Sequence, residues 1–250
     1  MRTIVILVAL GVLVLAGCEE DRTQKLIEAA SARVSAEAPP PVAPAKPAGM
    51  PEIVIDDLGA YIGGQRANPV DGPGRTKLKS IVKDLPIGGK SVELAAKPKA
   101  KLATVAAVLE ELGRAGAPQI WVKTEGRTDL PRRIPLVPQS RIDKPSPCTL
   151  VASVLDDLST ATWPFAGGGG QHMRKGFAGP DLTQTGDAVT KHLRGCKSGT
   201  AFFSAGKDTI WELAFNLAAT IVQADEDKKI DKLVLLGEQP VAGRPVELRE

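Results

Sequence analysis

The hydrophobic positions over residues 53–123 alternate between strand and helix patterns. The β-branched run Ile53–Ile55 predicts a strand that returns at Tyr61-Ile62. Apolar residues then recur at helical spacing in two segments, around 78–85 and 102–112, and each segment precedes a predicted strand, at 92–94 and 119–123. Asp71-Gly72-Pro73-Gly74 is interpreted as part of a loop, because it is rich in turn-forming residues. The predicted order is strand, strand, helix, strand, helix, strand.

A similar order is predicted for residues 150–236. A strand at 150–155 is followed by Asp156-Asp157-Leu158, which matches Asp56-Asp57-Leu58 at a spacing of 100 residues. A longer loop, which we expect to contain Trp163, leads to a helix that Asp181 caps with Gln184 in the capping-box position. Thr209 and Glu212 predict a second capping box. We interpret the two segments as a diverged tandem repeat, although two unrelated α+β units could share such an order.

The first residues of the chain have the pattern of an export signal. Arg2 precedes a short apolar run, and Leu15-Ala16-Gly17-Cys18 follows it. These four residues resemble the bacterial lipobox, which predicts cleavage before Cys18 and a lipid on its thiol. The alternative is an ordinary secretory signal or a short membrane helix with a chance cysteine. Since no later stretch is apolar enough to cross a bilayer, we expect a protein on the periplasmic side of the envelope, anchored to the inner or the outer membrane.

Changes in composition along the chain predict five parts. The predicted parts are a signal peptide (1–17), a lipidated cysteine with an Ala/Pro-rich linker (18–51), two small domains (52–130 and 148–237) and a C-terminal tail (238–250). Loss of residues 1–17 removes Arg2 and no acidic residue, which leaves 31 basic against 29 acidic residues. This balance gives no support to nucleic-acid binding. In an oxidising compartment Cys148 and Cys196 are expected to form a disulfide, the alternative being two free thiols.

The first unit resembles the periplasmic domain of the ExbD/TolR biopolymer-transport family. The resemblance covers about residues 52–125 and rests on Ile53-Val-Ile-Asp-Asp-Leu-Gly, Tyr61-Ile-Gly-Gly, Ser91-Val-Glu-Leu-Ala, and a helix ending in Ala115-Gly116 that leads into Gln119-Ile-Trp-Val-Lys-Thr. The second unit is similar only in element order. The resemblance implies an α+β fold of two tandem small domains, each a mixed sheet with two helices on one face. The family's transmembrane helix, which carries an Asp for ion passage, has no counterpart here.

The lipobox-like residues and the family resemblance together predict a non-enzymatic envelope lipoprotein. The resemblance implies that it binds envelope proteins of an ExbD/TolR-type system or peptidoglycan, with a homodimer as one arrangement. One alternative is a periplasmic lipoprotein that binds a small ligand between its two units. The other is a cell-wall hydrolase, because catalytic geometry is hidden in a sequence. No cofactor is expected.

Several local patterns resemble parts of known binding or catalytic sites. Gly89-Lys90-Ser91 lacks the leading glycine of a phosphate-binding loop. The histidines have too few neighbouring ligands to predict a metal site. The paired aspartates at 56–57 and 156–157 are interpreted as turn residues. The candidate contacts for a partner or a glycan are loop residues, namely Trp163, Phe165, His172 and Arg174.

Overall fold

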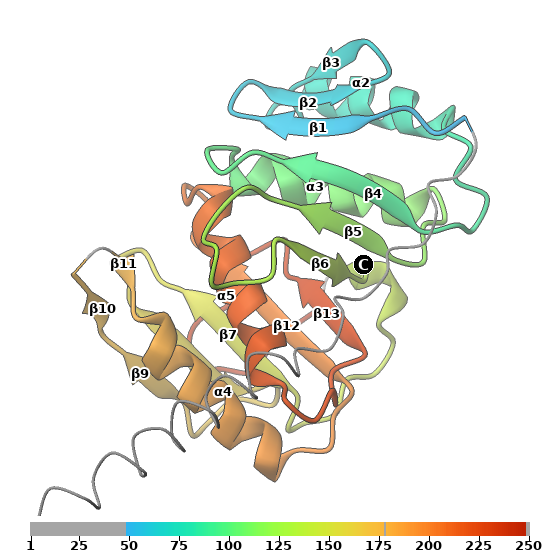
Figure 1. Ribbon diagram of the computed structural model, residues 1–250. Helices are drawn as coiled ribbons and strands as arrows, with labels where there is room; N and C mark the ends of the chain where they lie inside the picture. The colour runs from blue at the N-terminus through green and yellow to red at the C-terminus, as the bar shows by residue number, and fades with distance from the viewer. Residues whose placement is uncertain (1–48, 178, 249–250) are drawn as a thin grey trace, which may run out of the picture. The chain divides into compact units, whose positions relative to one another are not determined.

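The computed structural model describes residues 49–177 and 179–248, and all of them belong to one compact unit. The fold is α+β. In this part of the chain two mixed sheets are accompanied by four α-helices (Figure 1). The prediction of an α+β protein with two sheet-containing parts is therefore confirmed.

The first sheet has six strands in the order β3-β2-β1-β4-β5-β6. Its strands are β1 (Ile53–Asp56), β2 (Gly59–Ile62), β3 (Gln65–Ala67), β4 (Val92–Ala96), β5 (Ile120–Lys123) and β6 (Arg133–Leu136). β1, β4 and β5 run parallel, whereas β2, β3 and β6 are antiparallel to their neighbours. The sheet thus extends past residue 130, where the sequence predicted the first domain to end.

Helices α2 (Gly72–Lys83) and α3 (Leu102–Arg114) lie on one face of this sheet (Figure 1). Their apolar stripes, which include Leu78, Val82, Val105 and Leu112, are buried against the inward side chains of the strands. Burial alternates along β1 and β4, so their other face carries half-buried Val54, Asp56 and Ala95 and exposed Glu93.

The start of α2 corrects one prediction. Residues 71–74, interpreted as a loop, form the cap and first turn of the helix, because the Asp71 side chain accepts a hydrogen bond from the Gly74 backbone N–H at 2.5 Å. Pro73 is tolerated there since the first helical N–H groups have no intrahelical acceptor.

The second sheet repeats the order of the first. It runs β13-β12-β7-β8-β9, against β5-β4-β1-β2-β3, with the same parallel and antiparallel pairings. Its strands are β7 (Leu150–Val154), β8 (Thr160–Pro164), β9 (Gln171–Met173), β12 (Thr200–Ala205) and β13 (Lys232–Leu235). A small ribbon of β10 (Lys175–Gly176) and β11 (Gly179–Pro180) follows β9, and a 3-10 turn (Gln139–Arg141) follows β6. The shared topology is a fact of the fold; duplication as its origin stays a prediction.

Helices α4 (Leu182–Gly195) and α5 (Trp211–Ala224) pack on one face of the second sheet (Figure 1). The predicted N-cap of α4 is confirmed, because the Asp181 side chain accepts from the Gln184 N–H at 3.0 Å. The Gln184 side-chain amide donates to the Asp181 carboxylate at 2.9 Å, whereas in a capping box that side chain accepts from the N-cap backbone N–H. The predicted capping box at Thr209 is wrong. α5 is capped by carbonyls from the loop before α3, since Trp211 N donates to Ala100 O at 2.8 Å and Glu212 N to Pro98 O at 3.0 Å.

The two halves share one hydrophobic core. A single cluster of buried side chains includes Leu94 and Val108 from the first half and Phe203 and Trp211 from the second. The indole N–H of Trp211 donates to Thr124 Oγ1 at 2.8 Å, and Val137 N donates to Leu233 O at 2.8 Å between the edges of the two sheets.

The two sheets differ in how their second faces are covered. In the second sheet that face packs Val151, Trp163, Phe202 and Val234 against Ile142, Val246 and Leu248, so the predicted C-terminal tail closes the sheet. In the first sheet the corresponding face carries exposed Tyr61, Glu93 and Lys123. We call this surface the open face.

Candidate functional site

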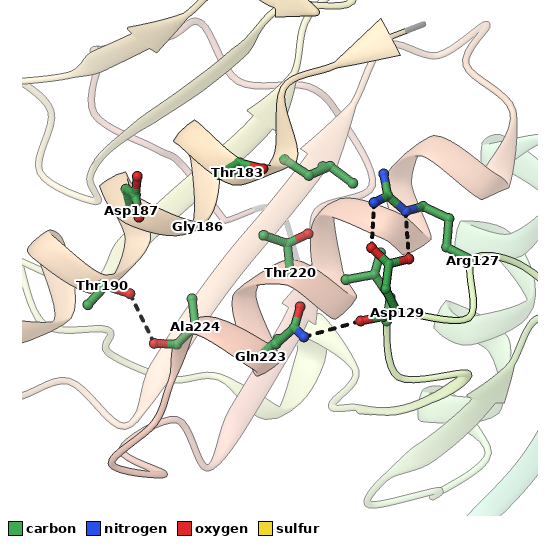
Figure 2. A pocket seen from close by; sticks show the side chains of 11 residues that line it. Arg127, Asp129, Thr183, Gly186, Asp187, Thr190, Thr220, Gln223 and Ala224 are labelled. Atoms are coloured by element: carbon green, nitrogen blue, oxygen red, sulfur yellow. Dashed lines mark hydrogen bonds and ion pairs between the residues drawn. The ribbon is translucent and has the colours of Figure 1, made fainter. Parts of the chain in front are cut away.

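A groove lies between α4, α5 and the loop that joins β5 to β6 (Figure 2). Its cavity volume is about 300 Å³, and its lining residues are Arg127, Asp129, Leu130, Leu182, Thr183, Gly186, Asp187, Thr190, Thr220, Gln223 and Ala224. The loop belongs to the first half of the chain and both helices belong to the second. The groove therefore exists only because the two halves pack together.

The loop wall of the groove is held by a bidentate ion pair. Arg127 Nε lies 2.9 Å from Asp129 Oδ1, and its Nη2 lies 2.5 Å from Asp129 Oδ2. The hydrogen bond from Arg127 lowers the pKa of Asp129, and the positive charge of the guanidinium acts in the same direction. Gln223 on α5 donates to the Asp129 carbonyl at 3.2 Å, which ties the loop to the helix.

The helix wall is built from small and hydroxylated residues. On α4 the groove is lined by residues three or four positions apart, which lie on one side of the helix, namely Thr183, Gly186, Asp187 and Thr190. Thr190 Oγ1 donates to the Ala224 carbonyl at 3.2 Å. Gly186 faces Thr220 of α5, and a Cβ at position 186 would lie 3.6 Å from Thr220 Cγ2. The absence of a side chain at Gly186 thus leaves the groove open at its middle.

The groove lining combines hydrogen-bonding groups with apolar side chains. The lining offers carboxylates, hydroxyls, an amide and a guanidinium around apolar patches, but no histidine, cysteine or lysine. A nucleophile with an adjacent base is the usual requirement for covalent catalysis. Within residues 49–177 and 179–248, no group of three His, Cys, Asp or Glu side chains is arranged to hold a metal ion.

The equivalent position in the first half, between α2 and α3, holds a smaller hollow of about 210 Å³. Arg114 forms ion pairs with both Glu110 and Glu111 there, and Arg75 and Lys79 also line the hollow. Both halves therefore have a hollow at this topological position, and the one in the second half is larger.

The open face of the first sheet contains a second notable cluster. Arg133 of β6 stacks over the ring of Trp121 at 4.8 Å and forms an ion pair with Glu93 of β4. Trp121 is only 7% exposed, although it lies on the solvent-facing side of the sheet. Neither its Nε1 nor Arg133 Nε has a hydrogen-bond partner in the described part of the chain. Tyr61, 42% exposed, lies on the same face.

The predicted cysteine pair lies at disulfide distance. Cys148 Sγ and Cys196 Sγ are 2.08 Å apart, with a Cα–Cα distance of 5.7 Å. The bond joins the segment before β7 to the end of α4, and His192 Nε2 lies 2.7 Å from the Cys148 carbonyl oxygen beside it. Cys18 lies outside the described residues, so lipidation stays a prediction.

The predicted aromatic contacts are corrected by the structure. Trp163 lies in β8 and is fully buried, and its Nε1 donates to the Arg244 carbonyl at 3.0 Å. Phe165 is half-buried against Phe202 with ring centroids 5.3 Å apart. Neither is a free surface contact, because the C-terminal tail packs over them. His172 and Arg174 are exposed on and beside β9 and line neither hollow.

The paired aspartates act in turns. Asp56 accepts from the Leu58 N–H at 2.9 Å and pairs with Arg66 of β3. Asp157 accepts from both the Ser159 N–H and hydroxyl, which lowers its pKa. Ser159 Oγ also lies 2.9 Å from His172 Nε2, so the serine stands between acid and histidine. A catalytic triad needs the histidine in the middle, and this cluster does not provide it.

The sequence allows a ligand site between the two units as an alternative, but none of the groove residues is a candidate there, because a loop near residue 127 and two helices beyond residue 181 converge only in the folded chain. Comparison with known proteins adds no assignment: the chain matches no protein-family model, no curated protein and no solved structure. In the described part of the chain, every helix is too short or too polar to cross a bilayer.

Proposed function

We propose that this protein is a non-enzymatic envelope lipoprotein, attached to a membrane through Cys18, whose folded part binds another envelope component. The partner is an envelope protein of an ExbD/TolR-type system or peptidoglycan. The lipobox-like Leu15–Cys18 supports the anchor, and the resemblance of residues 52–125 supports the accessory role. The observation that carries the binding role is the open face of the first sheet.

The open face has the residue types that dominate binding energies. Tyr, Trp and Arg are enriched among hot-spot residues, and Tyr61, Trp121 and Arg133 supply one of each. Tyr61 is 42% exposed and Glu93 is exposed on the same face, so a partner can reach this surface. Trp121 Nε1 and Arg133 Nε are buried beneath it. The second sheet cannot use its equivalent surface, since the tail covers it.

Photo-crosslinking in intact cells tests the binding role. A benzoylphenylalanine at Tyr61, on the open face, should give one dominant crosslinked product that mass spectrometry can identify. The matched control is the same group at Val241, which is 63% exposed and belongs to the C-terminal tail, outside the first sheet. The same scattered products from both positions would contradict the proposal. Sedimentation of the purified protein with insoluble peptidoglycan then separates a protein partner from the cell wall.

Metabolic labelling tests the anchor separately. An alkyne palmitate analogue should label the wild-type protein and leave Cys18→Ser unlabelled. A wild-type protein that carries no label and fractionates with soluble proteins would contradict lipid attachment.

The groove favours a second candidate function, binding of a small ligand, because it is formed by both halves and contains polar groups around an apolar floor. Such a mixture is typical of ligand sites.

A further inference from the structure

We propose that the groove between α4, α5 and the β5–β6 loop binds a short peptide with a free ammonium group and a free carboxylate, the ammonium at Asp187 and the carboxylate at Arg127. The inference rests on the groove alone. It requires neither the lipid anchor nor the open face.

The ammonium end is assigned from Asp187. Its carboxylate is exposed on α4 at one end of the groove (Figure 2) and has no hydrogen-bond or ion-pair partner among the described residues. An ionised carboxylate accepts hydrogen bonds only, so it selects a ligand that donates them. Thr183, one turn earlier on the same helix, adds a hydroxyl beside it.

The carboxylate end is assigned from Arg127. A guanidinium has five N–H donors, and the bidentate contact with Asp129 uses only two of them. The pair with Asp129 fixes the guanidinium plane, and the remaining donors are available to a ligand. Figure 2 shows Arg127 and Asp187 at opposite ends of the lined space.

The middle of the groove limits the ligand to small residues. A volume of about 300 Å³ is at the lower end of the range for ligand pockets. Gly186 leaves room for a backbone to approach α4, and Leu182 and Ala224 provide apolar contact. A carboxylate acceptor at one end, unshared guanidinium N–H donors at the other and a narrow, partly apolar middle complement a short chain of small residues that has an ammonium at one end and a carboxylate at the other.

Titration calorimetry of the full-length protein with tri-alanine tests the proposal. We expect saturable one-to-one binding. N-acetylation and C-amidation of the peptide should each weaken it about tenfold, the effect of losing one charge-assisted hydrogen bond. Asp187→Asn should weaken binding of tri-alanine by a similar factor, and N-acetylation of the peptide should not weaken its binding to this variant further. The double variant Arg127→Gln/Asp129→Asn, which leaves no unpaired carboxylate, should be insensitive to C-amidation.

Two further variants separate occupancy of the groove from loss of fold. Gly186→Leu should abolish binding because its side chain fills the middle of the groove, whereas Gly186→Ala fits beside Thr220 and should retain weakened binding. The matched control is Glu110→Gln/Arg114→Gln in the α2–α3 hollow, which should bind as wild type. The proposal is overturned if tri-alanine does not bind, or if the N-acetylated and C-amidated peptides both bind as tightly as tri-alanine. It is also overturned if a folded Gly186→Leu variant binds tri-alanine as tightly as wild type. None of these results bears on lipid labelling or on crosslinking at Tyr61.

Discussion

At the scale of single residues, close backbone approach decides which glycines matter. A Cβ at Gly74 would lie 1.6 Å from the Asn68 carbonyl oxygen, whereas one at Gly72 would meet nothing within 4 Å. We expect Gly74→Ala to lower the free energy of unfolding by about 2 kcal/mol or more, in the range of strained core substitutions. Gly72→Ala, in the same helical turn, should change it by less than about 0.5 kcal/mol. Urea denaturation measures both, and equal effects would contradict this packing.

The ion pair between Asp56 and Arg66 should make stability depend on pH. The hydrogen bond from Arg66 lowers the pKa of Asp56 below its ordinary value of 3.8, and the Leu58 N–H contributes in the same direction. A lowered folded-state pKa stabilises the fold above the unfolded-state pKa, and this stabilisation is lost as the pH falls through the folded-state value.

Asp56→Asn should therefore be less stable than wild type at pH 6. The difference should shrink as the pH falls below 3.8 and disappear below the lowered folded-state pKa of Asp56. Since the pair is partly exposed, the difference at pH 6 should be small, below about 1 kcal/mol, and should shrink in high salt. Chemical denaturation across pH measures it. A difference that persists unchanged at pH 3 would assign the effect to the turn rather than to the charge.

At the scale of elements, the two helices of the second half begin differently. The first N–H groups of α4 are satisfied by Asp181, four or fewer residues away in sequence, and those of α5 by carbonyls from about 110 residues earlier in the chain. Asp181→Ala should lower the free energy of unfolding by about 1 kcal/mol, as for a lost N-cap. Thr209→Ala should change it by less than about 0.5 kcal/mol, because no helix N–H depends on its side chain. A larger loss at Thr209 would restore the capping box that the sequence predicted.

At the scale of the whole molecule, the shared core predicts one cooperative unit. Buried residues of both halves belong to one cluster, and the groove is formed by both. We expect Gly74→Ala, in the first half, to increase the hydrogen exchange of the most protected amides in β12 of the second half by the same factor as in β4. Exchange through global unfolding reports the full loss of stability everywhere. Faster exchange confined to the first half would show two independently unfolding domains, as the predicted boundaries at 130 and 148 imply.

The sequence by itself determined the elements whose signals are local. The β-branched run at 53–55, the apolar spacing of α2 and α3, and the cap at Asp181 all act within a few residues, so periodicity and capping rules identify them. Two mixed sheets followed from the order of these elements. The pairing of Cys148 with Cys196 could be expected because few alternatives existed.

Only the tertiary structure decided the features that depend on contacts between residues far apart in the sequence. Trp163 appears as a loop aromatic in the sequence, yet the C-terminal tail buries it. α5 lacks a side-chain cap because the first half supplies its acceptors. The groove joins residues near 127 with residues beyond 181, and the first sheet keeps an open face because nothing in the described chain packs on it as the tail packs on the second. Such features arise from contacts between segments far apart in sequence, and no local pattern encodes them.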